Sequence, residues 1–339
     1  MNNPMGVLII GTGWVSGEHI KAYMANPHTE IRGLCNIHPE KAERIRSRYR
    51  LDCPVGSDYR ELLKRSDIDI VSICSIHSSH YREAVDTLEA GKHVMVEKPL
   101  CMSFEQARHL RELTEKTGQK TAVGFVARWY SAIRALKNMA DAGMIGEPYY
   151  IESDYWHEVA PGWKSSAESA GTALLTGGVH AVDMMRYFQK PDVEAVEVFA
   201  YSHPPGRRMD FSYDPTIVML VKFDNGTLGK VGCCLQPSMP YVFHLQVLGS
   251  KGAIRGPRIY SEALQADPIF MDVPGVYPDS YDVTHHPFDE EINYFIDCII
   301  NDREAMIGIR DAYKTHEIAF AAERSAATGK PIPLPLAAE

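Results

Sequence analysis

Residues Gly6 to Ser16 read Gly-Val-Leu-Ile-Ile-Gly-Thr-Gly-Trp-Val-Ser. A short apolar run ends directly at a Gly-x-Gly turn, and helical periodicity follows the turn. Gly11 permits a tight turn, and Gly13 lets backbone amides approach a phosphate at the positive end of the helix. The third position of the fingerprint is Ser16, which is still small enough for close packing of helix on strand. The stretch therefore predicts a strand, a pyrophosphate-binding turn and a helix.

The first third of the chain repeats this alternation of short apolar runs and amphipathic segments, which is typical of βα units with a parallel sheet. The predicted strands are Gly6–Ile10, Ile31–Cys35, Ile70–Cys74, His93–Val96 and Thr121–Gly124. The predicted helices are Val15–Met24, Pro39–Tyr49, Asp58–Lys64, Tyr81–Ala90 and Phe104–Lys116. A doubly wound, dinucleotide-binding domain over residues 1–124 follows.

The pattern changes over residues 125–339, which we expect to form a second domain. A helix is predicted at Tyr130–Ala142, and Asn225-Gly226 predicts a hairpin between strands at Thr216–Phe223 and Thr227–Leu235. Val242–Leu248 alternates strictly, which favours an antiparallel sheet covered on one face. Two helices, Phe288–Ile300 and Arg310–Ala327, are predicted to close the chain. The fold class is therefore α/β, with a parallel sheet first and an open, mainly antiparallel sheet second.

Length and composition exclude several classes of protein. The chain has 339 residues, enough for two domains, and its formal net charge of −9 argues against a nucleic-acid or anionic-membrane binder. Its apolar runs fall far short of the roughly 20 residues that span a bilayer. The N-terminus lacks the charged and apolar regions of a secretory signal, so a cytoplasmic location is expected. The seven cysteines show no C-x-x-C spacing, so reduced thiols and no metal are expected.

A longer motif stands at the end of the predicted strand His93–Val96, where the chain reads Glu97-Lys98-Pro99. Together with the glycine turn, His80, and Gly177-Gly178-Val179-His180 followed by Asp183, it resembles the Gfo/Idh/MocA family of glucose-fructose oxidoreductase and inositol dehydrogenase. The resemblance covers nearly the whole chain. It implies a Rossmann domain, a second α/β domain with an open sheet, NAD or NADP, and a sugar or cyclitol substrate.

The cofactor contacts expected from the fingerprint and the resemblance lie in the first domain: Gly11, Thr12, Gly13, Trp14, Val15, Asn36, Ser75, His80, Glu97 and Lys98. An acid that grips the ribose usually stands about 20 residues beyond the glycines, and Asn36 occupies that place. Asn adds no charge to repel a 2′-phosphate. NAD is expected and NADP stays open, with His38 and Lys41 either facing such a phosphate or simply solvated.

The resemblance assigns catalytic roles to Lys98 and His180. Lys98 would stabilise charge on the reacting oxygen, and His180 would take the hydroxyl proton as hydride leaves the same carbon. Without the resemblance, Lys98 could be a surface lysine and His180 a capping or core histidine. The family usually has Asp four residues before this histidine. Here Thr176 stands there, and its hydroxyl can form hydrogen bonds but cannot stabilise an imidazolium by charge.

Substrate contacts are predicted from Arg128, His157, Trp163 and Lys164, in addition to Lys98 and His180. Aromatic rings can stack on sugar C–H faces while His157 and Lys164 donate hydrogen bonds, although tryptophans near a sheet edge are often packing residues. Arg128 could instead form an ion pair between the two domains. A homodimer or homotetramer is expected, because the uncovered sheet face would expose apolar residues and the family commonly pairs through it.

Three functions remain open. The first is oxidation of a secondary hydroxyl of a sugar, sugar derivative or cyclitol by NAD(P), or reduction of the ketone. The second, motivated by Thr176, is cleavage of a glycosidic bond by transient oxidation and elimination with retained NAD. The third is a non-catalytic dinucleotide-binding sensor, against which the intact Glu97-Lys98-Pro99 argues.

Overall fold

The computed structural model describes residues 4–160, 162–206, 210–278 and 286–337. The chain forms two compact units. The first comprises Met1–Phe125 and Pro287–Tyr313, and the second comprises Val126–His286 and Lys314–Glu339. The expected boundary after residue 124 lies beside the first crossing. Residues 287–313, however, belong to the first unit rather than to the second, because a helix in this segment packs against the first helix of the chain.

The first unit is built on a parallel sheet in the order β3-β2-β1-β4-β5-β6. Its strands are β1 (Met5–Ile10), β2 (Thr29–Cys35), β3 (Val55–Gly56), β4 (Ile70–Ile73), β5 (His93–Val96) and β6 (Thr121–Val123). The interior strands are apolar on both faces, and Val7, Leu8 and Ile9 are fully buried. The order reverses between β1 and β4, which is the switch point where such sheets bind ligands beyond their carboxyl ends.

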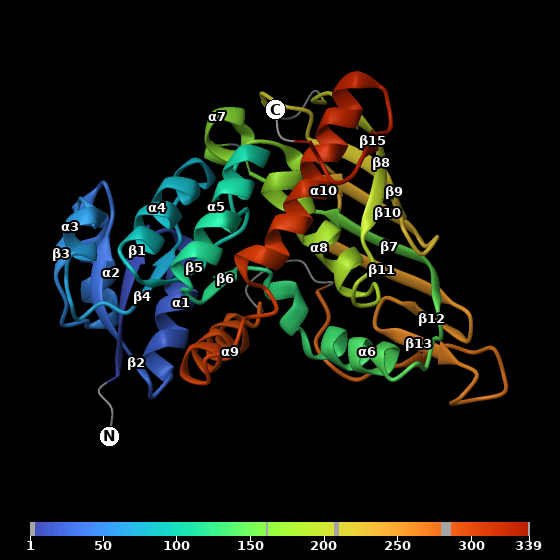
Figure 1. Ribbon diagram of the computed structural model, residues 1–339, viewed down its shortest axis with the longest axis horizontal. Helices are drawn as coiled ribbons and strands as arrows, with labels where there is room; N and C mark the ends of the chain where they lie inside the picture. The colour runs from blue at the N-terminus through green and yellow to red at the C-terminus, as the bar shows by residue number, and fades with distance from the viewer. Residues whose placement is uncertain (1–3, 161, 207–209, 279–285, 338–339) are drawn as a thin grey trace. The chain divides into compact units, whose positions relative to one another are not determined.

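The helices of this unit are α1 (Trp14–Ala25), α2 (Pro39–Tyr49), α3 (Tyr59–Leu63), α4 (His77–Glu89), α5 (Phe104–Thr117) and α9 (Phe288–Ile300). Helix α1 packs on β1 and β2 and also against α9, while α4 packs on β4 and β5 and against α5 (Figure 1). The side chain of Ser103 caps α5 by accepting from the amide of Gln106, and Gly118 ends it with φ 70°. Both features agree with the local signals in the sequence.

The second unit is built on a sheet in the order β14-β13-β12-β11-β7-β10-β9-β8-β15. Its strands are β7 (Pro148–Trp156), β8 (Ala195–His203), β9 (Thr216–Phe223), β10 (Leu228–Cys234), β11 (Val242–Gly249), β12 (Gly252–Arg255), β13 (Arg258–Ser261), β14 (Met271–Asp272) and β15 (Ile332–Pro333). Strands β7 and β10 pair in parallel, whereas β7 and β11 are antiparallel. The hairpin predicted at Asn225-Gly226 joins β9 to β10, and Gly226 has φ 88°.

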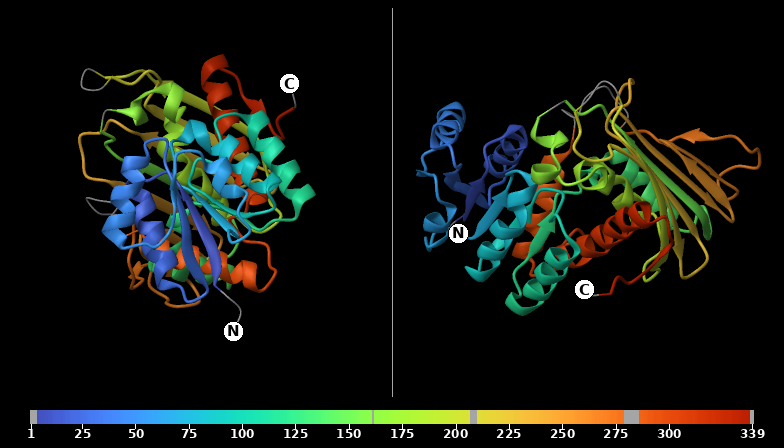
Figure 2. Two further views of the ribbon diagram at one scale, coloured as in Figure 1. Left: turned by 90° about the vertical axis from the view of Figure 1, so that its left-hand side faces the viewer. Right: turned by 90° about the horizontal axis from the view of Figure 1, so that it is seen from above.

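The remaining helical segments are η1 (Val126–Trp129), α6 (Ser131–Asp141), η2 (Trp163–Ser165), α7 (Ala167–Ala170), the π-helical turn η3 (Leu174–Gly178), α8 (Val179–Tyr187) and α10 (Ile309–Thr328). Helix α8 and turn η3 pack on β7 and β10. The second view of Figure 2 shows α6, α8 and the later turns of α10 on one face of this sheet. The other face carries no helix from the part of the chain that the structure describes.

The predicted fold class is confirmed, with parallel strands first and a mainly antiparallel sheet second. The alternation in β11 is also confirmed, because Phe243, Leu245 and Val247 are buried on the helix-covered side. Helix α4 begins at His77 rather than at the predicted Tyr81, because its first turn is polar and gives no apolar period. Among the described residues, no helix is both long and apolar enough to cross a membrane.

Candidate functional site

The glycine turn after β1 is closed on one side and open on the other. Gly11 has φ 87°, and a Cβ there would lie 2.6 Å from the carbonyl of Cys74 at the end of β4. A Cβ on Gly13 would meet no atom within 4 Å. Ser16 is buried and donates its hydroxyl to the carbonyl of Gly13 at 2.7 Å, which braces the turn. Open space beside the first amides of α1 fits a pyrophosphate.

Asn36, the residue expected at the ribose, connects the end of β2 to the same turn. Its side-chain Nδ2 donates to the hydroxyl of Thr12 at 2.7 Å, and its side-chain Oδ1 accepts from the backbone amide of His38 at 2.9 Å. Trp14 begins α1 with 54% of its surface exposed and its ring edge near Phe288, and Val15 is half-buried. Ribose binding by Asn36 remains a prediction.

Ser75 and His80 lie near the ends of β4 and β5. The hydroxyl of Ser75 donates to a carboxylate oxygen of Glu83 at 2.5 Å, and burial raises the pKa of Glu83 to about 7. The Nδ1 atom of His80 lies 2.7 Å from the carbonyl oxygen of Pro99, and its Nε2 lies 3.2 Å from that of Ser75. Burial lowers the pKa of His80, so its ring is neutral, carries one N–H and can donate to only one of these two carbonyl oxygens at a time.

Glu97 and Lys98 follow β5 directly. Glu97 is 8% exposed, and its carboxylate lies so close to Gly124 that a Cβ there would approach it to 2.9 Å. Burial disfavours the charge of Glu97, but a hydrogen bond and the charge of His19, with the charge of Lys98, outweigh burial and lower its pKa. Lys98 is half-buried, and its ammonium also acts electrostatically on His80. The predicted cofactor residues thus gather at the carboxyl ends of β1, β4 and β5.

In the second unit, His180 is the second residue of α8 and is 7% exposed. Its ring stacks on that of Tyr155 from β7. Thr176 lies in the preceding turn η3, where its hydroxyl is 3.4 Å from the carbonyl oxygen of Ala170 and 3.3 Å from the hydroxyl of Tyr213. The turn therefore positions both residues on the helix-covered face of the sheet.

Arg128 is buried in η1 and binds Asp183 of α8. Its Nε donates to one carboxylate oxygen at 2.7 Å, and its Nη2 donates to the other at 2.5 Å. The guanidinium also lies 4.9 Å from the ring centre of Tyr187. Arg128 does form an ion pair, but with a residue of the same unit and not between the two domains as the sequence left open. Its contact with substrate remains a prediction.

The other predicted substrate residues lie on two segments. His157 follows β7, and its Nδ1 is 2.9 Å from the hydroxyl of Tyr155. Trp163 is 41% exposed in η2, with the ammonium of Lys164 at 5.6 Å from its ring centre. Tyr155 therefore contacts both His157 and His180, while Trp163 and Lys164 form a separate pair.

Comparison with known proteins decides the family. Residues 5–125 match the oxidoreductase family with an NAD-binding Rossmann fold, and residues 133–255 match the Gfo/Idh/MocA C-terminal domain. This chain is a member of the Gfo/Idh/MocA oxidoreductase family. The family assignment confirms the resemblance noted in the sequence, and the NAD-binding Rossmann domain confirms the expected cofactor.

Individual relatives of this Gfo/Idh/MocA chain are distant. An inositol 2-dehydrogenase of Salmonella typhimurium (strain LT2) is 25% identical over 84% of this chain and 85% of its own length. The uncharacterized oxidoreductase YrbE of Bacillus subtilis is 25% identical over 96% of this chain and 95% of its own. A levoglucosan dehydrogenase in complex with NADH and levoglucosan superposes with a TM-score of 0.88 at 22% identity, covering 98% of this chain and 100% of that structure. The last likeness establishes the fold alone.

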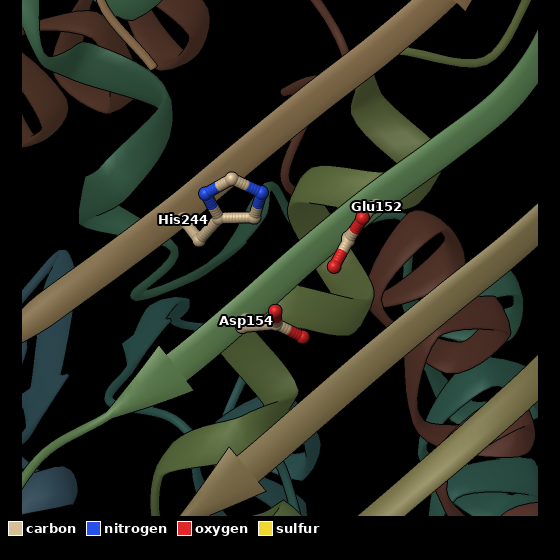
Figure 3. A group of neighbouring side chains, drawn as sticks. All are labelled: Glu152, Asp154 and His244. Atoms are coloured by element: carbon tan, nitrogen blue, oxygen red, sulfur yellow. The ribbon is translucent and has the colours of Figure 1, made fainter. Parts of the chain in front are cut away.

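A group of possible metal ligands lies elsewhere, on the uncovered face of the second sheet. Figure 3 shows Glu152 and Asp154 on β7 beside His244 on β11, with the helices behind the sheet, and their ligand atoms lie within 4.8 Å of one another. The ammonium of Lys230 lies 3.0 Å from Glu152 and 2.7 Å from Asp154. The ammonium of Lys230 therefore balances the charge of these carboxylates, and we assign no metal to the group.

Two side-chain contacts at these sites were not predicted from the sequence. His19 contacts Glu97 from within α1, and its place two turns into the fingerprint helix was the available signal. Tyr155 contacts His180 from β7. It belongs to the aromatic stretch Tyr155-Trp156-His157, which suggests substrate contacts, but nothing local predicts its contact with His180, because an aromatic residue in a strand is ordinary packing.

Proposed function

We propose that this Gfo/Idh/MocA member transfers hydride between NAD and a secondary hydroxyl of a sugar, sugar derivative or cyclitol. The observation that carries the proposal is Lys98, half-buried at the carboxyl edge of the sheet that also bears the glycine turn. Bound NAD supplies the hydride acceptor. Lys98 stabilises negative charge on the reacting oxygen, and His180 accepts its proton.

The placement of the charged groups supports this assignment of roles. Glu97 is paired with His19 behind the edge of the sheet, so it is held away from solvent while the neighbouring Lys98 is half-buried. His180 is 7% exposed, and the imidazole of histidine is the side chain that most often accepts a proton in general base catalysis. His157, Trp163 and Lys164 are proposed to contact the sugar hydroxyls and C–H faces.

The test is a turnover screen. The purified chain is incubated with polyols, cyclitols and the corresponding ketones, with NAD or NADP, and nicotinamide absorbance is followed. We expect turnover with at least one substrate, and turnover roughly a hundred- to a thousandfold slower with Lys98→Met. Protein that binds NAD but turns over no member of the panel would count against the proposal.

A second candidate is glycosidic cleavage through transient oxidation with retained NAD, and Thr176 favours it. Its hydroxyl contacts Ala170 and Tyr213 and brings no negative charge to a protonated base. Such an enzyme would release an aglycone without net reduction of added NAD and would retain nucleotide through purification. Mass spectrometry of the purified chain separates the two candidates, because a nucleotide-free protein that consumes NAD stoichiometrically excludes the second.

A further inference from the structure

The rings of His180 and Tyr155 form a buried stack in the second unit. Their centroids are 6.0 Å apart and their planes differ by 24°. Tyr155 is 8% exposed and His180 is 7% exposed. Offset stacking at this separation is a favourable arrangement of two planar rings. The Tyr155 ring therefore lies nearly parallel to the His180 imidazole and can hold the plane of that imidazole.

The backbone that leads to His180 rests on the same tyrosine. A Cβ added to Gly177 would lie 2.4 Å from Cε1 of Tyr155, a distance that no side chain tolerates. The turn η3 ends with a wide bond from the amide of Val179 to the carbonyl of Leu174, which is the geometry of a π-helix. Tyr155 thus contacts both the ring of His180 and the turn that sets its direction.

Tyr155 is itself held on its other sides. Its hydroxyl lies 2.9 Å from Nδ1 of His157, and its ring meets the ring of Tyr241 at 5.6 Å and that of Phe243 at 6.4 Å, both edge to face. Burial raises the pKa of Tyr155, so the phenol stays protonated and can donate to Nδ1 of His157. A ring held by hydrogen bond, backbone and two aromatic edges makes a rigid support.

We propose that Tyr155 is the positioning residue for His180. The proposal rests on the proposed function, in which His180 accepts the proton. Thr176, four residues before His180, directs its hydroxyl to Ala170 and Tyr213. The tyrosine ring instead sets the plane of the imidazole, and the close approach of Gly177 and the edges of the neighbouring rings hold the tyrosine in place.

Two substitutions at Tyr155 separate the ring from its hydroxyl. Tyr155→Leu removes the stack, and the imidazole can then rotate away from its productive direction. We expect kcat to fall about a hundredfold with little change in KM, which is the scale of a misplacement of about 1 Å. Tyr155→Phe keeps the stack and should retain most of kcat. Gly177→Ala, which pushes the intact ring aside, should reproduce the loss.

The matched control is Phe223→Leu, which removes a buried ring from the same hydrophobic core at the far end of β9, beside Ala195 and Gly229 rather than beside Tyr155. Its unfolding free energy should fall about as much as that of Tyr155→Leu, while its kcat should stay near that of the wild type. A direct readout is the NMR signal of the His180 ring protons in the full chain. Loss of the ring current should shift it in Tyr155→Leu but not in Tyr155→Phe.

The outcomes are distinct. A folded Tyr155→Leu with near wild-type kcat, or a Phe223→Leu with an equal loss of kcat, would overturn the positioning role. Should Tyr155→Leu not fold, Gly177→Ala decides by the same measures. Failure of the proposed function looks different, because the wild type would then show no turnover while the His180 signal still responded to Tyr155→Leu.

Discussion

The Nε2 atom of His19 lies 3.0 Å from Oε1 of Glu97 in the interior of the first unit. The other ring nitrogen of His19 lies 2.8 Å from the hydroxyl of Ser72, and the ring of Phe288 covers it at a centroid distance of 5.6 Å. Burial disfavours the imidazolium, but Cys74 and Glu97 outweigh burial and raise the pKa of His19. Glu97, the residue next to Lys98 in the chain, is thus held in place by a buried ion pair with His19.

We expect His19→Leu to destabilise the chain by about 3 to 5 kcal/mol, because it leaves Glu97 buried without its partner. Urea unfolding measures this loss. The double variant His19→Leu/Glu97→Leu should lose less than the sum of the single variants, since no charge then remains unpaired. Additive losses would contradict the pairing.

Lys98→Met keeps the length of the side chain and removes its charge. Loss of one donor to a developing oxyanion costs about 3 to 4 kcal/mol, so we expect kcat to fall roughly a hundred- to a thousandfold. The affinity for NAD, measured by calorimetry, should change little, because the pyrophosphate contacts belong to the glycine turn. Turnover close to that of the wild type would show that the proposed site is wrong.

Arg128→Lys tests the buried pair with Asp183. Lysine carries the same charge but cannot form the two parallel bonds seen from Nε and Nη2. We expect a loss of about 2 kcal/mol in unfolding free energy, on the scale of a broken charged hydrogen bond. The exposed pair Arg303–Asp297 is the control, and Arg303→Lys should change stability by under about 0.5 kcal/mol.

Glu83 makes stability depend on pH. Its folded pKa of about 7 lies above the ordinary value of 4.5, so the folded state retains a proton that the unfolded state has released between these values. The contribution of protonated Glu83 to the free energy of unfolding is full below pH 4.5 and is lost as pH rises through about 7. We expect Glu83→Gln to be more stable than the wild type at pH 8 by up to about 3 kcal/mol, with little gain at pH 4.5. Equal gains at both pH values would contradict the assignment; Glu40→Gln on the exposed face of α2 is the control.

The uncovered face of the second sheet should bind a second copy of the chain. Leu220 and Leu228 are 57% and 52% exposed on it. The ammonium of Lys230 is already paired with Glu152 and Asp154, so its burial would not leave that charge without a partner. Light scattering at micromolar concentration should give two or four times the monomer mass. Leu220→Glu should shift the protein towards the monomer, and a monomeric wild type would refute the expectation.

Local signals were enough for most of the secondary structure and for the glycine turn. The run before Gly11, the caps of α5 and the Asn225-Gly226 hairpin depend on residues within a few positions of one another, and each was predicted with nearly the observed bounds. Periodicity and turn chemistry act at this range. The first turn of α4 is polar and shows no apolar periodicity, so the predicted helix began at Tyr81 and not at His77.

The amino-acid pattern is enough to predict the parallel sheet, the turn that fits a pyrophosphate and the candidate residues Lys98 and His180. Which residues support them depends on contacts that form only when the chain folds. His19 meets Glu97 across 78 positions of the chain, Arg128 meets Asp183 across 55, and α9 returns to pack on α1. Such contacts arise when distant segments bury apolar surface together, and a buried charge must then find whichever partner the packing brings within reach.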